Sequence, residues 1–398
     1  MSKTGSDIVF QENLQRKSPG SKYPEFSLNE TLSAFSFHRS MPSYEKTPLH
    51  QMKGLADYLG IESLWIKDES RRFRLNSFKA LGASYALGKW LMKKTGQSSD
   101  QPTFDRMIWW FSNLEGDFSL VTATDGNHGC GVAWLASVCG CKAKIFVPSC
   151  TSEPRIANIE KLGAEVIVVD GNYDKAVRVA QRSANDGNSL FIQDTTTEQE
   201  ETVPEYIMQG YLTLIHETYD QLPLEERPTH ILLQAGVGSF AAAAQAYISN
   251  RFGDKGPRII LVEPEGAACF YESFKRNDGD MTCLENYHSV MAGLSCGRPN
   301  RLAWRILKGE SEGVLRCHDR VSYLGMRVLH QPLSKDAKII SGESGAVGLG
   351  ALFKICKEAE ASDIRAKLGL DQSSKVLLIS TEGATDPDGY RKGLWEDL

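Results

Sequence analysis

Lys79 is the first residue whose position in the sequence suggests a chemical role. It ends the string NSFK at residues 76–79, which follows a strand-like run and opens an amphipathic stretch at residues 80–93. An amine at the start of a helix lies near backbone N–H groups, and removal from water would lower its pKa towards that of a nucleophilic free amine. Because a lone lysine is usually a solvated charge, this string by itself identifies no site.

Two glycine-containing turns could complete a site around this lysine. Residues 124–129 (TDGNHG) and residues 234–239 (QAGVGS) each lie between a predicted strand and a predicted helix. Ligands of open parallel sheets bind where strands end, and glycine lets the backbone approach a flat ring. The second turn could present backbone N–H groups to a phosphate. It lacks the lysine of a P-loop and the later glycine of a dinucleotide-binding turn, so it fits one phosphate better than a nucleotide.

An amine, a phosphate-binding turn and a turn that accommodates a ring are what an aldehyde cofactor with a phosphate group requires. Residues 77–79 (SFK), residues 126–128 (GNH) and the glycine-rich turn occur here in that order. In this combination the chain resembles the fold-type II pyridoxal-phosphate enzymes, the group of threonine dehydratase, serine dehydratase and the tryptophan synthase β chain. The resemblance implies that the cofactor is pyridoxal 5′-phosphate.

Within that family, the sequence is most similar to the diaminopropionate ammonia-lyases, over residues 40–395. The segments around residues 109–116 and before residue 44 do not match them. The segments that carry the similarity are residues 67–70 (KDES), 124–129, 193–195 (QDT), 207–211 (IMQGY), 232–238 (LLQAGVG), 291–294 (MAGL) and 340–350 (ISGESGAVGLG).

The resemblance implies a reaction and the residues that perform it. The reaction is the α,β-elimination of D- and L-2,3-diaminopropionate to pyruvate and two molecules of ammonia. Lys79 would bind the cofactor aldehyde and act as the base for the L-isomer, and Asp125 would be the base for the D-isomer. Asp194 would be a second acid of the site, which either holds the ammonium group of the substrate or orients the water-free pocket.

Further residues would contact the cofactor itself. Asn127 would form a hydrogen bond with its 3′ oxygen, and Ser380 or Thr381 would face its pyridine nitrogen. A hydroxyl partner leaves that nitrogen unprotonated and the ring a weaker electron sink, which suits elimination of a β leaving group. The residues that would bind the phosphate are Gly236, Val237, Gly238 and Ser239.

Several of these residues also have a structural interpretation. Asp125 could cap a helix, and Asp194 could end a strand and satisfy a turn. His128 is more typical of a hydrogen-bonded structural histidine than of an acid or base. Glu343 could cap a helix, and we place it near the site without a catalytic role. Cys269 and Cys296 resemble a pair that some relatives bring close together; a regulatory disulfide is one interpretation, and two reduced thiols are the other.

Two other functions are compatible with parts of this pattern. One is a serine or threonine dehydratase of the same fold, in which the position of Asp125 would hold a small apolar residue. The other is a regulatory protein that binds the cofactor without turnover, which a missing Lys79 or an interrupted glycine-rich turn would have favoured. Asp125, Lys79 and the glycine-rich turn are all present and favour the lyase.

The elements that must position these residues alternate between strands and helices. This alternation predicts an α/β fold with parallel sheets in two lobes and the cofactor between them. Residues 98–116, which include Trp109 and Trp110, have no clear period, and we expect an irregular excursion whose aromatic rings serve packing. The predicted strands are residues 63–67, 120–124, 143–148, 165–170, 189–194, 230–234, 259–263 and 376–380.

The same pattern suggests a division of the chain. We expect an N-terminal arm at residues 1–40, which lies on the fold or on another subunit. A large cofactor-binding domain would comprise residues 41–85 and 206–398, and a small domain residues 86–205. A homodimer is expected from the resemblance alone.

The composition restricts the remaining possibilities. The chain has 398 residues, of which 41% are hydrophobic and 24% charged, with a formal net charge of −5. This charge and the lack of a basic cluster argue against a nucleic-acid partner, and no apolar run is long enough to span a membrane. The polar start predicts no signal peptide, and nine scattered cysteines suit a reducing compartment, so we expect a cytoplasmic protein. No ligand spacing predicts a metal site.

Overall fold

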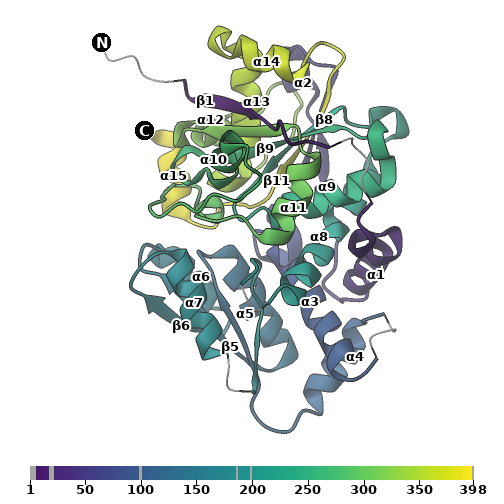
Figure 1. Cartoon of the computed structure of the whole chain (residues 1–398), viewed down its shortest axis with the longest axis vertical. Coiled ribbons are helices and arrows are strands. Elements are labelled where there is room, and N and C mark those ends of the chain that lie inside the picture. The colour runs from purple at the N-terminus through teal and green to yellow at the C-terminus, as the bar shows by residue number, and fades with distance from the viewer. Residues whose placement is uncertain (1–5, 18–21, 98–100, 185–186, 198–199, 397–398) are drawn as a thin grey trace.

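Two sheets, each at the centre of one lobe, organise the chain (Figure 1). The computed structural model describes residues 6–17, 22–97, 101–184, 187–197 and 200–396. The larger sheet has the order β1-β10-β9-β8-β11-β3-β2, and the smaller has the order β6-β5-β4-β7. Their strands are β1 (Ile8–Glu12), β2 (Leu49–Gln51), β3 (Ser63–Asp68), β4 (Ser119–Ala123), β5 (Lys142–Pro148), β6 (Glu165–Val169), β7 (Ser189–Phe191), β8 (His230–Gln234), β9 (Arg258–Pro264), β10 (Gly313–Cys317) and β11 (Lys375–Ser380).

All neighbouring strands run parallel except the two edge strands β1 and β2, which pair antiparallel with β10 and β3. The central strands β4 and β8 are buried along their whole length, as strands covered on both faces by helices must be. All eight predicted strands are present. The sequence analysis did not predict β1, β2 and β10, which have three to five residues each.

Helices cover both sheets. The helix α6 has a proline in its first turn, a position that proline favours. The helices are α1 (Leu28–Arg39), α2 (Lys53–Leu59), α3 (Lys79–Lys94), α4 (Phe104–Ser112), α5 (Asn127–Cys139), α6 (Glu153–Glu160), α7 (Tyr173–Ser183), α8 (Thr202–Gln221), α9 (Ser239–Phe252), α10 (Cys269–Arg276), α11 (Arg301–Glu310), α12 (Asp319–His330), α13 (Glu343–Lys357), α14 (Ser362–Leu368) and α15 (Pro387–Trp395).

The described part of the N-terminal arm lies on the chain's own fold. β1 extends the larger sheet by pairing with β10, and α1 packs against α8. The small sheet falls within residues 119–191, and the larger sheet is built from segments on both sides of it.

The expectation of an irregular excursion at residues 98–116 is wrong for its centre, where α4 forms; residues 98–100 lie outside the described residues. The apolar side of α4 supplies the reason, because Met107 and Phe111 are buried against the small lobe. The Trp110 ring lies 6.2 Å from that of Trp90, whereas Trp109 is 67% exposed. Packing therefore accounts for two of the three aromatic rings but not for Trp109.

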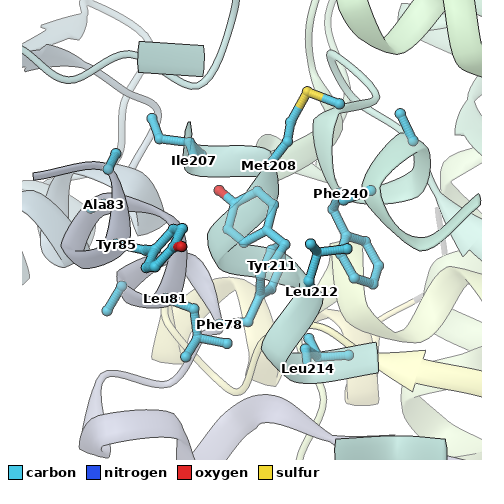
Figure 2. Packing of buried hydrophobic residues seen from close by; sticks show 14 of the residues in the cluster. Phe78, Leu81, Ala83, Tyr85, Ile207, Met208, Tyr211, Leu212, Leu214 and Phe240 are labelled. Atoms are coloured by element: carbon cyan, nitrogen blue, oxygen red, sulfur yellow. The ribbon is translucent and has the colours of Figure 1, made fainter. Parts of the chain in front are cut away.

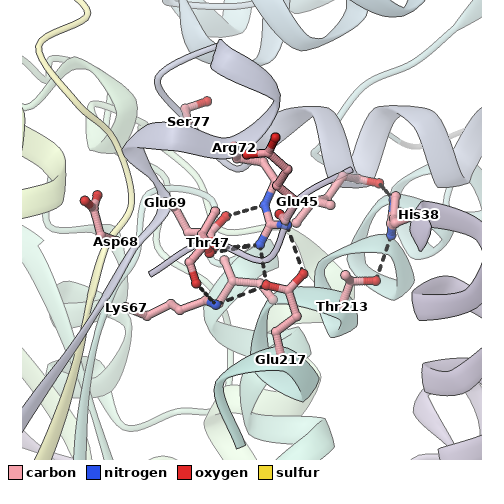
Figure 3. A network of polar contacts seen from close by, with 12 residues as sticks. His38, Glu45, Thr47, Lys67, Asp68, Glu69, Arg72, Ser77, Thr213 and Glu217 are labelled. Carbon is pink, nitrogen blue, oxygen red and sulfur yellow. Dashed lines mark hydrogen bonds and ion pairs between the residues drawn. The ribbon is translucent and has the colours of Figure 1, made fainter. Parts of the chain in front are cut away.

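A buried ionic network fixes the segment that leads from β3 to Lys79 (Figure 3). Arg72 donates hydrogen bonds to both carboxylate oxygens of Glu69 and to both of Glu217, at 2.8 to 2.9 Å. Lys67 donates to Glu217 at 3.0 Å and to the carbonyl of Thr47 at 2.9 Å. The side chains of both cations are fully buried, so the network ties the start of α3 to α8.

Aromatic packing connects the two cofactor-related segments of the large lobe (Figure 2). The ring of Phe78 lies 4.8 Å from the ring of Tyr211 and 4.8 Å from that of Phe240. Phe78 precedes Lys79, and Phe240 follows the glycine-rich turn. The cluster therefore holds the start of α3 beside the start of α9.

Candidate active site

The order of the strands explains why distant segments meet. β8, β11 and β3 are neighbours in the larger sheet and run parallel, so their carboxyl ends share one edge. These ends lead to the glycine-rich turn, to Thr381 and, through the buried network, to Lys79. In the smaller sheet, β4 and β7 are neighbours, and they lead to Asp125 and Asp194. A site at the carboxyl ends of parallel strands follows directly from this topology.

A cavity between the two lobes brings most of the predicted residues together. Ser380 does not line it: its hydroxyl donates a hydrogen bond to Ser341 Oγ at 2.8 Å. Its neighbour Thr381 does line the cavity, so of the two candidates for the pyridine nitrogen only Thr381 faces this space. The predicted residues in the wall are Lys79, Asp125, Asn127, Asp194, Gly236, Val237, Gly238, Ser239 and Thr381.

Lys79 and Asp194 form an ion pair, with 2.6 Å between Nζ and Oδ2. Burial alone would lower the pKa of Lys79, but the charge and hydrogen bond of Asp194, together with Tyr211 and Asp125, raise that pKa above its ordinary value. Burial would likewise raise the pKa of Asp194, and Lys79 lowers it well below the usual range. The expectation of a lowered lysine pKa is therefore wrong for this state of the protein, because a carboxylate 115 residues away is the nearest partner.

Asp125 has no such partner. Burial raises the pKa of Asp125 to about 6, against the opposing effects of Arg155 and Lys79. No side-chain hydrogen bond joins it to another residue within the described ranges, and the helix α5 begins at Asn127 with no side-chain cap. Asp125 is thus a cavity-facing carboxylate and not a helix cap.

The glycine-rich turn leaves no room for larger residues. Gly238 has a φ of +87°, and a Cβ built there would lie 2.4 Å from Cζ of Phe270. A Cβ on Gly236 would lie 3.0 Å from the carbonyl oxygen of Gly293. The turn ends at the first residue of α9, where the free backbone N–H groups of a helix favour an anion. Ser239 donates to the carbonyl of Asp194 at 2.6 Å, which joins this turn to the other lobe.

Two predicted residues of the small lobe are held by polar contacts. Asn127 donates a hydrogen bond from Nδ2 to the carboxylate of Glu382. His128 Nε2 lies 2.8 Å from the carbonyl of Ile192, and burial lowers its pKa, which fits a neutral structural residue. Ser344, also in the cavity wall, has a buried hydroxyl with no hydrogen-bond partner.

A second cavity adjoins the first and shares Asp125 and Tyr173 with it. Arg155 and Glu343 both line this second cavity, with 3.8 Å between Nη2 and Oε2. Burial raises the pKa of Glu343 to about 7, and the charge of Glu382 adds to this effect. Glu343 therefore lies near the site, as the sequence analysis placed it.

Sequence analysis missed several residues of the site. Tyr173 donates to Asp194 Oδ1 at 3.2 Å and accepts from Gln193 at 2.7 Å. Tyr173, Arg155, Glu382 and Ser344 belong to no turn that the motifs singled out, although Ser344 lies in the string at residues 340–350 that carries the family resemblance.

Comparison with known proteins agrees with this geometry. A family model for pyridoxal-phosphate dependent enzymes matches residues 41–382. The chain belongs to this family. It is 41% identical to the diaminopropionate ammonia-lyase of Salmonella typhimurium over 395 residues, which are 98% of each protein. A crystal structure of the diaminopropionate ammonia lyase from Escherichia coli in complex with D-serine covers 98% of this chain and 97% of its own, with a TM-score of 0.89 and 39% identity.

The same Escherichia coli enzyme in complex with an aminoacrylate-PLP azomethine reaction intermediate has a TM-score of 0.87 and 38% identity, with 98% of this chain and 97% of that chain covered. These findings confirm the predicted fold class, the resemblance to diaminopropionate ammonia-lyases and pyridoxal phosphate as the cofactor of this family. They also confirm that the protein is a lyase of the pyridoxal-phosphate-dependent family.

Other expectations concern cysteines, metals and membranes. All nine cysteines are free thiols. Cys296 lies in the wall of the cofactor cavity, and the Cys269 thiol contacts the backbone carbonyl of Gly236. The described residues contain no group of three or more metal-ligating side chains. Among the helices of the described ranges, none is long and apolar enough to cross a membrane.

Proposed function

We propose that the protein eliminates ammonia from D- and L-2,3-diaminopropionate with pyridoxal phosphate, forming pyruvate and a second molecule of ammonia after hydrolysis. The observation that carries this proposal is the cavity itself, in which a lysine, two carboxylates whose pKa values are shifted in opposite directions and a crowded glycine turn meet. Relatives of about 40% identity over nearly the whole chain are diaminopropionate ammonia-lyases. The homodimer and the cytoplasmic location remain part of the proposal; the homodimer rests on the resemblance, and the location rests on the nine scattered cysteines.

The residues in the cavity fit the cofactor. Lys79 would bind the aldehyde, and the turn from Gly236 to Ser239, whose two glycines leave no room for a Cβ, would hold the phosphate against the start of α9. Asn127 would contact the 3′ oxygen, and Thr381 is the better candidate than Ser380 for the pyridine nitrogen because it lines the cavity. When bound, the cofactor supplies the electron sink that stabilises negative charge at the α-carbon of the substrate.

The two carboxylates would divide the work on the substrate. Asp194 is held ionised by Lys79 and can receive the ammonium group of an incoming amino acid. Asp125, whose pKa burial raises to about 6, is mostly ionised at neutral pH and still basic enough to take the α-proton of the D-isomer. Lys79, which also lines the cavity, would take the α-proton of the L-isomer.

The leaving group fits this assignment as well. The β-amine of the substrate can leave as ammonia when it is already protonated, so it needs no acid from the protein. A β-hydroxyl group needs a proton donor, which an ionised Asp125 does not provide. The site should therefore prefer diaminopropionate to serine.

The test is pyruvate release from D- and L-2,3-diaminopropionate, L-serine and L-threonine by the wild-type protein, Asp125→Asn and Lys79→Ala. We expect the wild-type protein to release pyruvate from both diaminopropionate isomers. Asp125→Asn should lose far more activity on the D-isomer than on the L-isomer, and Lys79→Ala should lose activity on both. If only the hydroxy amino acids react, the protein is a dehydratase; if no amino acid reacts, it binds the cofactor without turnover.

A further inference from the structure

Arg155 is a buried cation beside the candidate base that none of the roles above uses. Its side chain is 5% exposed, and it lines the second cavity together with Asp125. A Cβ built on Gly126 would lie 3.4 Å from Arg155 Nη1 and 3.5 Å from its Cδ. The arginine therefore packs directly against the residue that follows Asp125 in the chain.

The hydrogen bonding of Arg155 is incomplete. Its Nη1 is buried and has no hydrogen-bond partner in the part of the chain that the structure describes, and its Nη2 lies 3.8 Å from Glu343, beyond hydrogen-bond distance. A buried guanidinium with an unpaired donor is unfavourable unless an anion lies close by.

Four carboxylates surround this guanidinium: Glu382, Glu343, Asp125 and Asp386. Two of them have other donors, because Glu382 accepts hydrogen bonds from Asn127 and from a backbone N–H group, and Asp386 caps α15 and accepts from a serine. Glu343 has a pKa raised by burial to about 7 and is therefore only partly ionised near neutral pH. Neither Glu343 nor Asp125 accepts a hydrogen bond from another side chain among the described residues, and of these two only Asp125 also lines the cofactor cavity.

Lys79, the cation of the cofactor cavity, cannot replace Arg155. Lys79 Nζ is 2.6 Å from Asp194, which takes up its charge. In addition, Lys79 is the residue that would bind the cofactor. A positive charge that stabilises the Asp125 carboxylate must therefore come from a residue that lines the second cavity.

We propose that Arg155 is a positioning residue that keeps the Asp125 carboxylate ionised, and that it thereby decides whether the D-isomer is a substrate. This inference rests on the proposed function of Asp125. Arg155 lines the second cavity but not the cofactor cavity, so it acts through Asp125, which lines both.

Other charged groups also face Asp125 across the two cavities. The cations are Lys79 of α3 and Lys392 of α15, and the carboxylates are Asp194, Glu343, Glu382 and Asp386. Burial favours the neutral forms of His128, Tyr173 and Cys296 in the first cavity. The remaining titratable side chains, in the wall of the second cavity, are Cys150, Tyr287, His288 and Tyr323. Arg155 is distinguished from the other cations by its burial and its unpaired donor.

The first measurement is the pKa of Asp125 itself, from carbon-13 NMR of the full-length chain labelled at aspartate carboxyl carbons before cofactor is added. The Asp125→Asn spectrum assigns the signal. For Arg155→Met we expect the midpoint to rise by about one to two pH units, as loss of a close opposite charge predicts. Arg155→Lys, which keeps the charge, should retain most of the wild-type midpoint, and Glu343→Gln, which removes a charge of the opposite sign, should not raise it.

The second measurement is kcat/KM against pH for each isomer. In Arg155→Met the acid limb for D-2,3-diaminopropionate should move to higher pH, with about half of the activity lost at pH 7 for a shift of one unit and recovery at higher pH. The dependence of kcat/KM on pH for L-2,3-diaminopropionate should stay the same as in the wild type. Recovery at higher pH separates lost ionisation from structural damage, which would reduce both isomers at every pH.

The outcomes distinguish the two proposals. If Asp125→Asn retains activity on the D-isomer, the proposed role of Asp125 is wrong, and the proposed role of Arg155, which depends on it, is wrong as well. If Asp125→Asn loses the D-isomer but Arg155→Met shifts neither the NMR midpoint nor the acid limb, only the inference about Arg155 is overturned. If Arg155→Met does not fold, the NMR titration midpoint of Asp125 in Arg155→Lys decides the question. A midpoint equal to that of the wild type would support the role of the charge, and a midpoint raised by about one to two pH units would refute it.

Discussion

Replacing Glu217 by glutamine should destabilise the fold strongly, because Glu217 is the centre of the network that leads to Lys79. The variant leaves Arg72 and Lys67, whose side chains are fully buried, without the carboxylate that accepts hydrogen bonds from both. Removal of one partner of a buried ion pair costs about 3 to 5 kcal/mol, since the remaining charge stays out of water.

The ionisation of Glu217 gives a second measure of the same effect. Burial would raise the pKa of Glu217, but Arg72 outweighs burial and lowers it from 4.5 to about 2. A difference of roughly 2.5 between the two pKa values corresponds to about 3 kcal/mol. Because the pKa is lower in the folded state, this stabilisation is complete above pH 4.5 and is lost as the pH falls towards 2.

The assay is the free energy of unfolding from urea titrations at pH 7 and at several values between pH 5 and 3. Asp220→Asn is a matched control on the same helix, since its ion pair with Lys46 is 42% and 53% exposed and should be worth less than about 1 kcal/mol. We expect Glu217→Gln to cost several times more than the control at pH 7, and the gap to the wild type to narrow as the solution is acidified. Equal costs for the two variants would refute the reasoning.

Two further predictions concern the cofactor cavity. Gly238→Ala should weaken pyridoxal phosphate binding roughly tenfold in an absorbance titration, because the strain at φ +87° and the contact with Phe270 distort the phosphate turn. The control is Gly253→Ala at the other end of α9, where a Cβ would have no described atom within 4 Å, and this variant should bind the cofactor as the wild type does. Equal affinities of the two variants would contradict the assignment of the turn to the phosphate. A thiol reagent should label the exposed Cys150 and Cys283 in the folded protein but react with Cys269 and Cys296 only after unfolding. The reason is that burial raises the pKa of the Cys269 and Cys296 thiols well above the ordinary value. Rapid labelling of Cys296 in the folded protein would contradict this prediction.

Local sequence patterns predicted most of the scaffold. Runs with a continuous apolar centre, such as those at residues 230–234 (HILLQ) and 376–380 (VLLIS), form buried strands, because a parallel strand covered on both faces needs no alternation. The short strands β1 and β2 escaped prediction because edge strands of three to five residues depend on a partner and not on their own pattern. The helix α4 was missed because its buried side becomes apparent only against the small lobe.

The sequence by itself determined which residues could do the chemistry. Lys79, Asp125, Asp194 and the glycine-rich turn each follow a strand, and a turn after a parallel strand opens at the ligand-binding edge of the sheet. Steric demands such as that on Gly238 are also local, because φ is a property of one residue.

Only the tertiary structure decided the charge states and the choice between neighbours. Asp194 reverses the expected direction of the pKa of Lys79, Thr381 and not Ser380 faces the cavity, and Arg155 lies beside Asp125. Each of these depends on burial and on partners far away in the chain. Electrostatic interactions act through space and strengthen as water is excluded, so no local pattern in the sequence could have supplied them.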